Sequence, residues 1–229
     1  MSIYLIDTET TGIVEPQVIE LAWTLYDRNK PGDSEQIYCQ RFLPTKAIEL
    51  GAMATHHIQL SDLSDCPPSS TATLPLDTEY IIGHNVDFDW KALGQPAVKR
   101  ICTQALARSL LPTLDSHRLG ALIYHFCPKM AGSWLKKAHE ASADVELCKY
   151  VLFELLRMRD NAGHARIDTA EELWQVSEVA RIPKIMSFGK HKGEPIEMVP
   201  AGYVSWYLKQ ADPDPYLVKA FQLVKAARR

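Results

Sequence analysis

Ser2-Ile3-Tyr4-Leu5-Ile6-Asp7-Thr8-Glu9-Thr10-Thr11-Gly12 opens the chain with a short apolar run that leads into two carboxylates. Residues 2–7 are expected to form a buried strand with Asp7 at its end. Residues 18–26, Val-Ile-Glu-Leu-Ala-Trp-Thr-Leu-Tyr, and residues 36–43 have the composition of two further strands. Three consecutive strands at the start of a domain favour an antiparallel meander.

The pattern then changes to alternating strands and helices. Strands are expected at residues 79–83 and 99–102, the first followed by a helix near 87–93 and the second by a helix that ends before Pro112. A further helix is expected to begin around Ser142, because five apolar side chains share one face there: Val145, Cys148, Val151, Leu152 and Leu155. The sequence therefore predicts an α/β fold, a mixed sheet with helices on its faces.

The C-terminal part has the composition of a separate small module. Residues 159–168, which contain Asp-Asn-Ala-Gly-His, are the best linker candidate. Thr169-Ala170-Glu171-Glu172 has the capping-box pattern, so a helix is expected to start there and to run to about Ala180. A basic loop bounded by glycines (189–193) and two more helices follow. We therefore expect a domain over residues 1–158, a linker, and a module over 169–229.

Composition excludes several classes of protein. The chain has 229 residues, enough for one full domain and a small appendage. Its five cysteines are scattered and odd in number, which argues for reduced thiols and against a structural zinc site. We see no cationic segment followed by an apolar stretch at the start, and no apolar run of membrane-spanning length. These features predict a cytoplasmic protein without a membrane partner.

Charge is distributed unevenly along the chain. Residues 1–149 hold 13 Lys+Arg and 18 Asp+Glu, a balance of −5, whereas residues 150–229 hold 12 and 10, a balance of +2. Two bound divalent cations would bring the first balance to −1. The C-terminal part is then the more positive end of a nearly neutral protein, which suits weak, salt-sensitive contact with phosphate.

Four acidic residues occur in settings that suit phosphodiester hydrolysis with two metal ions. Asp7 and Glu9 lie two apart on an extended segment, so both side chains project to one side of it. Asp89 and Asp144 each lie in the first turn of an expected helix. Buried carboxylates repel one another unless cations lie among them. Two divalent ions remove that repulsion and hold the attacking and leaving oxygens of a phosphoryl displacement.

His139 is the candidate base of this cluster, five residues before Asp144. Each patch also has an ordinary explanation on its own. Asp-x-Glu suits a polar turn after a strand, and Asp89 suits the positive end of a helix dipole. A lone histidine is more often a surface or core residue than a base. The combination of all five residues is what favours a catalytic site.

Three segments together resemble the exonuclease motifs of the DEDDh 3′→5′ exonucleases: residues 7–12, His84-Asn85-x-x-Phe88-Asp89, and His139-x-Ala141-x-x-Asp144. The resemblance spans about residues 1–158 and implies a ribonuclease H-like fold. It implies that the four carboxylates bind two metal ions and that His139 is the general base. Substrate contacts are expected from five residues, of which His56 would lie near the sugar of the 3′-terminal nucleotide: Thr8, Thr10, Ile13, His56 and Asn85. Oxygen-only ligands suit Mg²⁺, with Mn²⁺ as a substitute.

The C-terminal module resembles that of the exonuclease X subgroup within this family. The resemblance rests on Ser-Phe-Gly-Lys-His-Lys-Gly at 187–193 and Gly-Tyr-Val-Ser-Trp-Tyr-Leu at 202–208. Lys190 and Lys192 are expected to contact phosphate. Tyr203, Trp206 and Tyr207 are expected mostly to fill a small core.

The predicted reaction is stepwise release of 5′-mononucleotides from the 3′ ends of DNA, which makes DNA the expected partner. Alternatives are a proofreading subunit of a DNA polymerase, an exonuclease that trims RNA 3′ ends, and an inactive nucleic-acid-binding scaffold. Strand preference, protein partners and oligomeric state stay open at this point.

Overall fold

The computed structural model describes residues 2–27 and 36–227. The chain divides into two compact units, residues 1–177 and residues 178–229, and each is described by itself. The strands all belong to the first unit and are β1 (Ser2–Thr10), β2 (Val18–Leu25), β3 (Tyr38–Arg41), β4 (Thr78–Gly83) and β5 (Lys99–Cys102).

The strands form one mixed sheet in the order β3-β2-β1-β4-β5. The first three strands pair antiparallel, whereas β4 pairs parallel with both β1 and β5. The expected meander followed by strand–helix units is therefore confirmed. The sequence placed Asp7 at the end of its strand, but β1 continues to Thr10, so both acidic residues of the first motif lie within it.

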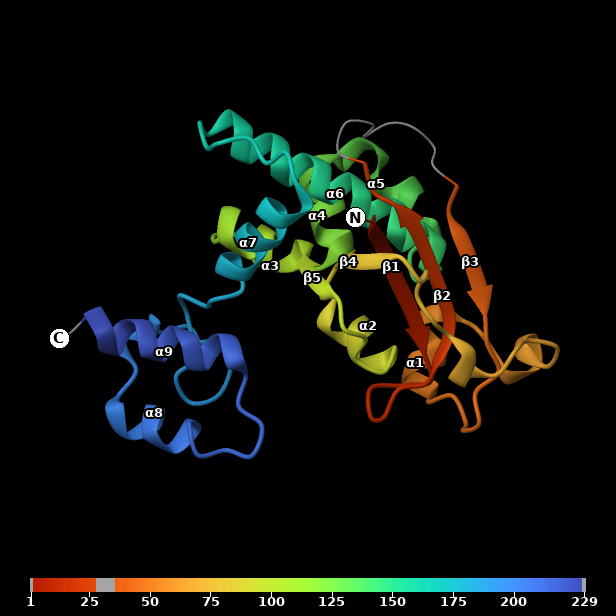
Figure 1. The fold of residues 1–229 in the computed structure, drawn as a ribbon, viewed down its shortest axis with the longest axis horizontal. Helices are drawn as coiled ribbons and strands as arrows, with labels where there is room; N and C mark the ends of the chain where they lie inside the picture. Colours follow the sequence, from red (N-terminus) through yellow and green to blue (C-terminus); the bar gives the residue numbers. More distant parts are fainter. Residues whose placement is uncertain (1, 28–35, 228–229) are drawn as a thin grey trace. The chain divides into compact units, whose positions relative to one another are not determined.

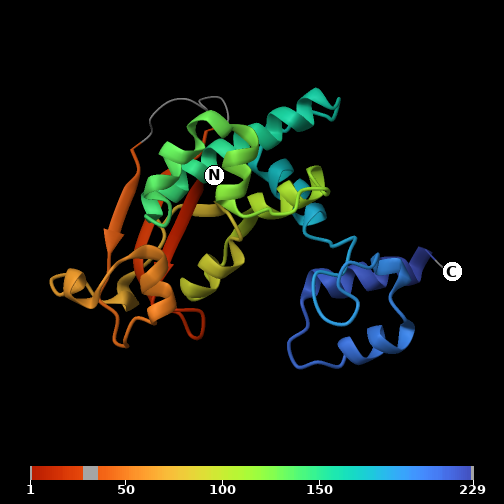
Figure 2. The ribbon, with the colours of Figure 1, turned by 180° about the vertical axis from the view of Figure 1, so that it is seen from behind.

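The helices of the first unit follow the strands in chain order. They are α1 (Leu50–His56), α2 (Asp87–Ala92), α3 (Thr103–Leu110), α4 (Leu119–Phe126), α5 (Pro128–Trp134), α6 (Ala141–Asn161) and most of α7 (Ala170–Ala180), with the 3₁₀ turns η1 (Leu60–Leu63), η2 (Ser69–Thr71) and η3 (Leu135–Lys137). In Figures 1 and 2, α4, α5 and α6 lie together against one face of the sheet. Helix α6 contacts both β1 and β2.

The two faces of β2 have different partners because side chains alternate along a strand. Ile19 packs with Ile48, Ile58 and Leu63, from the segment around α1 and η1. The neighbouring residue, Glu20, points to the opposite face, where its carboxylate meets the start of α6. A buried acidic side chain in the middle of an apolar strand is thus directed toward the same layer as the carboxylates of β1.

Helix α7 begins where the sequence predicted. The Thr169 hydroxyl accepts from the Glu172 amide at 3.1 Å, and the Glu172 carboxylate accepts from the Thr169 amide at 3.0 Å, which is the expected capping box. The linker expected at 159–168 differs, because α6 extends through Asn161. Most of α7 also belongs to the first unit, where Ser177 accepts from the amide of Cys102. The boundary between the units therefore lies about ten residues later than expected.

The second unit contains η4 (Ile196–Met198), α8 (Ala201–Tyr207) and α9 (Pro215–Ala227). Its small core is formed by Met186, Ile196, Val199, Tyr207, Leu217, Ala220 and Phe221. Of the three aromatic residues expected to fill this core, Tyr207 is buried and Tyr203 is half-buried, but Trp206 is 53% exposed. The expectation that most of these residues fill the core is therefore met by Tyr207 and Tyr203, and Trp206 is the exception. Across the described part of the chain, none of the helices is both long and apolar enough to span a bilayer.

Replacing Ser177 with alanine tests whether α7 is part of the first unit. Ser177 is fully buried, and its hydroxyl accepts from the Cys102 amide at 2.9 Å. The substitution leaves that buried N–H without a partner, so the free energy of unfolding should fall by about 1–3 kcal/mol. Denaturant unfolding measures the loss. Ser109→Ala, at an exposed position of α3, is the control and should change stability by less than about 0.5 kcal/mol. A Ser177→Ala effect as small as that would contradict the assignment.

Candidate active site

The carboxylates of β1 lie where the parallel pairing of the sheet ends. Strand β4 pairs with β1 only as far as Leu5 and then turns into α2 after Gly83. The edge of β1 beyond Leu5 is thus open toward α2. Asp7 and Glu9 alternate with Thr8 along this stretch, so they share one face of the strand. That face is the one directed toward α6, because Glu9 is paired with Glu20 in the β1–β2 ladder.

Asp89 completes the open edge of β1. It lies in the first turn of α2 and is buried. Its Oδ1 accepts from the Thr8 amide at 3.0 Å and from the Thr8 hydroxyl at 2.7 Å. The amide that the parallel ladder leaves without a strand partner is therefore satisfied by a side chain from the neighbouring helix. This pair of bonds fixes Asp89 beside the acidic residues of β1.

Asp144 and His139 come from the start of α6. The Asp144 carboxylate is mostly buried, and its Oδ2 lies 3.3 Å from the His139 amide and 4.0 Å from His139 Nδ1. His139 has a positive φ of 70°, which turns its half-exposed ring back toward Asp144. Ligand atoms of Glu9, His139 and Asp144 all lie within 4.8 Å of one another. The structure thus brings together the acidic residues and the histidine that the sequence selected.

Glu20 is a member of this site that sequence reasoning did not select. It is buried, and its two carboxylate oxygens accept from Arg41 Nε at 2.8 Å and from the Ala141 amide at 3.0 Å. Ala141 is the first residue of α6, three residues before Asp144. Glu20 therefore ties the strand that neighbours Glu9 to the helix that carries Asp144. In the sequence, the signal that could have identified Glu20 was an acidic residue within an otherwise mostly apolar strand.

Burial raises the pKa values of these carboxyls, and crowding adds to the effect for Asp7 and Glu9. Burial and the neighbouring acidic residues, Asp144 first among them, raise the pKa of Glu9 to about 8. Burial raises the pKa of Asp89 to about 7, against the two hydrogen bonds from Thr8 that favour its charged form. Burial and then the Asp89 charge raise the pKa of Asp7 well above its ordinary range. The pKa of Asp144 is also raised, mainly by burial. Such a cluster holds its full negative charge only beside a cation.

The donor set fits divalent metal ions. Oδ1 of Asp144 is buried without a hydrogen-bond partner in the described structure, although an uncompensated buried carboxylate oxygen is costly. A carboxylate oxygen of Asp144 also belongs to the group of close ligand atoms that Glu9, His139 and Asp144 offer. Oxygen-rich sites of this kind suit hard divalent cations.

Two of the residues expected to contact substrate also hold the motif together, and their contact with substrate stays a prediction. Thr8 and Thr10 are both buried, and the Thr10 hydroxyl donates to the carbonyl of Gly12 at 3.0 Å. Gly12 in turn leaves room for Glu49, since a Cβ at Gly12 would lie 2.2 Å from its carboxyl carbon. The threonine hydroxyls therefore order the end of β1 and the turn after it.

The other expected contact residues of the first unit are placed differently. Ile13 is 81% exposed, on a loop held by Lys46 Nζ through the carbonyls of Val14 and Glu15. Asn85 is exposed and has a positive φ of 71° in the turn before α2. Both side chains are free to meet a ligand. Their roles in substrate binding stay predictions.

His56 is buried at the end of α1. Its Nδ1 accepts from the Ile58 amide at 3.0 Å, whereas Nε2 faces the backbone of Thr10 without a hydrogen bond of normal geometry. Burial lowers the pKa of this ring. His56 therefore lies next to the end of β1, near the acidic residues, and its contact with a sugar stays a prediction.

His84, the first residue of the second motif, has a structural position. Its Nε2 donates to the His117 carbonyl at 2.8 Å, so Nδ1 is the acceptor for the Thr103 hydroxyl at 2.9 Å. Burial lowers the pKa of this histidine to about 4, which keeps it neutral. The two hydrogen bonds of His84 hold the end of β4 against α3. They thereby fix the turn from β4 into α2, the helix whose Asp89 binds Thr8 of β1.

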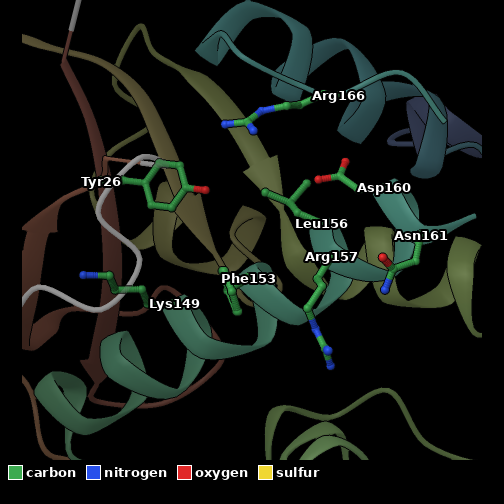
Figure 3. A pocket seen from close by; sticks show the side chains of 8 residues that line it. All are labelled: Tyr26, Lys149, Phe153, Leu156, Arg157, Asp160, Asn161 and Arg166. Atoms are coloured by element: carbon green, nitrogen blue, oxygen red, sulfur yellow. The ribbon is translucent and has the colours of Figure 1, made fainter. Parts of the chain in front are cut away.

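A cavity of about 260 Å³ lies away from these acidic residues. It is lined by Tyr26, Lys149, Phe153, Leu156, Arg157, Asp160, Asn161 and Arg166. Figure 3 shows Tyr26, just after β2, opposite side chains of the C-terminal half of α6. None of the predicted catalytic residues lines it. The candidate active site is therefore separate from this cavity.

The fold is that of the ribonuclease H-like exonucleases. A solved structure of exonuclease X in complex with 5′-overhanging duplex DNA matches with a TM-score of 0.57 at 23% identity, covering 76% of this chain and 99% of that chain. The zinc-bound form of Escherichia coli exonuclease I with single-stranded DNA matches with a TM-score of 0.55 at 18% identity, covering 70% of this chain and 41% of that one. These neighbours confirm the predicted fold class.

A curated relative extends the similarity to most of the chain. Exodeoxyribonuclease 10 of Escherichia coli strain K12 is 24% identical over 214 residues, which is 91% of each chain. The protein of the same name from E. coli O6:H1 gives the same values. The predicted resemblance to the exonuclease superfamily, and to exonuclease X within it, is thereby confirmed. No family model matches the chain.

The raised carboxyl pKa values predict how stability depends on pH. Without metal, the folded state holds protons on Glu9 and Asp89 up to pH about 8 and about 7, whereas the unfolded chain releases them near pH 4. A carboxyl with a raised folded pKa stabilises the fold at low pH and loses that contribution as the pH rises through the folded value. Unfolding free energy in EDTA should therefore fall between pH 6.5 and 8.

Below pH 6.5 His84 has the opposite effect on the free energy of unfolding. Its folded pKa is lowered from 6.5, so only the unfolded chain takes up this proton and stability rises with pH there. Between pH 6.5 and 8, therefore, the effect of the carboxyls on stability is not opposed by that of His84. Glu9→Gln should make the fall in unfolding free energy shallower. Added Mg²⁺ should raise the melting temperature because it binds the native state alone. The rise should be largest at pH 8, where the carboxyls are most fully deprotonated. A metal-free stability that stays level or rises across this window would contradict the crowding of these carboxyls.

Proposed function

We propose that this protein is a metal-dependent 3′→5′ exodeoxyribonuclease that releases 5′-mononucleotides from DNA 3′ ends. The convergence of Asp7, Glu9, Asp89 and Asp144 from β1, α2 and α6, with His139 beside Asp144, is the observation that carries it. Similarity to exodeoxyribonuclease 10 over 91% of the chain supports a DNA exonuclease. The direction of digestion and the roles of single residues are our inference.

The four carboxylates would hold two divalent ions, for which Mg²⁺ is the first choice and Mn²⁺ a substitute. When bound, such ions supply charge stabilisation to the phosphoryl group and to both oxygens of an in-line displacement. The chain's own contribution is to keep the carboxylates in place. Thr8 holds Asp89 through two hydrogen bonds, and Glu20 holds the start of the helix that carries Asp144.

His139 is the proposed general base. Its ring is half-exposed, so water and substrate can reach it, and it lies 4.0 Å from Asp144. Neutral imidazole would accept the proton of the attacking water, and the nearby carboxylate would stabilise the imidazolium that forms. Exposed Ile13 and Asn85 would contact the terminal nucleotide, with His56 near its sugar. Lys190 and Lys192, on the second unit, would contact phosphates of the DNA.

One digestion experiment distinguishes the proposed function from its alternatives, which are a proofreading subunit, an RNA-trimming enzyme and an inactive scaffold. DNA and RNA oligonucleotides, single- and double-stranded and labelled at either end, are incubated with Mg²⁺. Release of labelled mononucleotide from 3′-labelled DNA supports the proposal. Digestion of RNA alone would favour the trimming enzyme, and no digestion would favour the scaffold. Activity that requires an added polymerase would favour the proofreading subunit.

Substitution of Asp7 or Asp89 tests the metal ligands. Asp7→Asn and Asp89→Asn should each lower hydrolysis by more than about 100-fold, since even partners of metal ligands cost 10–100-fold when removed. Both metal-free variants should remain folded at pH 8, because each removes a charge from a self-repelling cluster. Rates from gel-resolved digestion and unfolding curves give the two readouts.

Asp87→Asn is the matched control for these variants. Asp87 lies on α2 two residues before Asp89, and its carboxylate forms an ion pair with Arg100. The same charge change should leave hydrolysis within a few-fold of the parent. If Asp87→Asn and Asp89→Asn lower the rate equally, the ligand assignment for Asp89 is wrong.

Substitution of His139 tests the base. His139→Ala should lower kcat by roughly 10²- to 10⁴-fold and remove the acidic limb of the pH–rate profile. The protection of the native state by Mg²⁺ should largely persist, since the carboxylates remain. His164→Ala, exposed after α6, is the control and should keep both the rate and the limb. An acidic limb that survives in His139→Ala would assign the base to another group.

A further inference from the structure

The second unit presents an exposed surface of aromatic and basic side chains that its core does not use. We call it the aromatic–basic surface and define it by Phe188, Lys190, Lys192, Tyr203 and Trp206. Trp206 is 53% exposed and Phe188 41% exposed, whereas tryptophan is mostly buried in folded proteins. In the described part of the chain, the side chain of neither lysine makes a hydrogen bond or an ion pair.

The rings of this surface are ordered by contacts with one another. Tyr203 lies between two neighbours, with its ring centroid 4.7 Å from His191 and 5.1 Å from Trp206. Phe188 lies 5.9 Å from the buried ring of Tyr207, one helical turn after Tyr203. The exposed rings are thus supported from behind by half-buried or buried ones. A supported ring loses little freedom when a ligand stacks on it.

The basic loop is fixed beside these rings. Gly189 has a positive φ of 69°, and a Cβ there would lie 2.7 Å from the Tyr203 hydroxyl oxygen, so the loop passes directly over that side chain. Its backbone closes through hydrogen bonds from Lys192 to Gly189 and from Gly193 to Met186. His191 is anchored by Glu194, 2.9 Å from its Nδ1. The flanking lysines are thereby held close to Tyr203.

We infer that this surface binds single-stranded DNA, with an unpaired base stacked on Trp206 and backbone phosphates on Lys190 and Lys192. Only unpaired bases offer free faces to an aromatic ring, and ring stacking with nearby cations is how proteins bind single strands without sequence preference. The second unit has nine Lys+Arg and five Asp+Glu, a balance of +4, which complements a polyanion. The choice of DNA rests on the proposed function.

Binding by the full chain carrying Asp7→Asn tests the inference without digestion of the probe. The probe is a fluorescent oligothymidylate of roughly ten nucleotides, within the site size common for such surfaces. Trp206→Ala should weaken binding by about fivefold or more, the loss expected for one stacked base, and Trp206→Phe should restore most of it. Lys190→Ala with Lys192→Ala should lower the log–log salt slope by roughly 1.4, or about 0.7 for each phosphate contact.

Two controls in the same unit match these changes. Leu223→Ala removes another 53% exposed apolar side chain, from α9, and Lys219→Ala with Lys225→Ala removes the same charge elsewhere on that helix. Neither should change affinity as much as its counterpart. Should Trp206→Ala disturb folding, Trp206→Phe and the lysine pair still decide.

Unchanged affinity in Trp206→Ala, or equal salt slopes for the two lysine pairs, would overturn the inference. The surface would then be a docking site for a protein. Hydrolysis of a dinucleotide by chains that keep Asp7 separates this outcome from failure of the proposed function. The rate should be the same in the parent and in Trp206→Ala if Trp206 contacts only longer strands, whereas absence of hydrolysis in the parent would reject the exonuclease itself.

Discussion

Mutual repulsion among buried carboxylates is the constraint around which the first unit is built. Asp7 and Glu9 share a face of β1, and Asp89 and Asp144 are brought to them from two helices. Burial and the neighbouring carboxylates disfavour the charged forms of Asp7 and Glu9, so the polypeptide must hold the cluster together by other means. It does so with backbone amides: that of Thr8 binds Asp89, and that of His139 binds Asp144. A bound cation would relieve the repulsion that remains, and this relief favours cation binding.

The sheet topology explains why such a cluster can form at this place. Parallel pairing of β4 with β1 stops at Leu5, so an amide of β1 is left for a side chain from α2. Glu20 then connects the antiparallel half of the sheet to α6. The two halves of the mixed sheet therefore contribute differently. The parallel half positions the second motif, and the antiparallel half positions the third.

Sequence patterns predicted the succession of strands and helices along the chain and selected the residues of the acidic cluster, because both can be recognised from short local motifs. The capping box at Thr169 is a similar case. Contacts between distant segments were not predictable in this way. Glu20 resembles an isolated polar residue in an apolar strand until its bond to Ala141 is seen, 121 residues away. The packing of α7 through Ser177 is also long-range, and for that reason the expected domain boundary fell too early. Trp206 lies on a short helix whose buried face cannot be assigned from so few residues.

The close approach of Gly189 to Tyr203 has a consequence for recognising this small unit in other proteins. A left-handed glycine at that position, a second at Gly193 with φ of 89°, and an aromatic ring ten residues further on form one geometric unit. A side chain at Gly189 would meet the Tyr203 hydroxyl, and replacing Tyr203 would remove the ring that the loop passes over. A search that requires these three features with their spacing, and leaves the lysines free, would find chains that share the loop geometry whatever ligand they bind. The presence or absence of lysine in the chains so found would then sort them by the charge of their ligands.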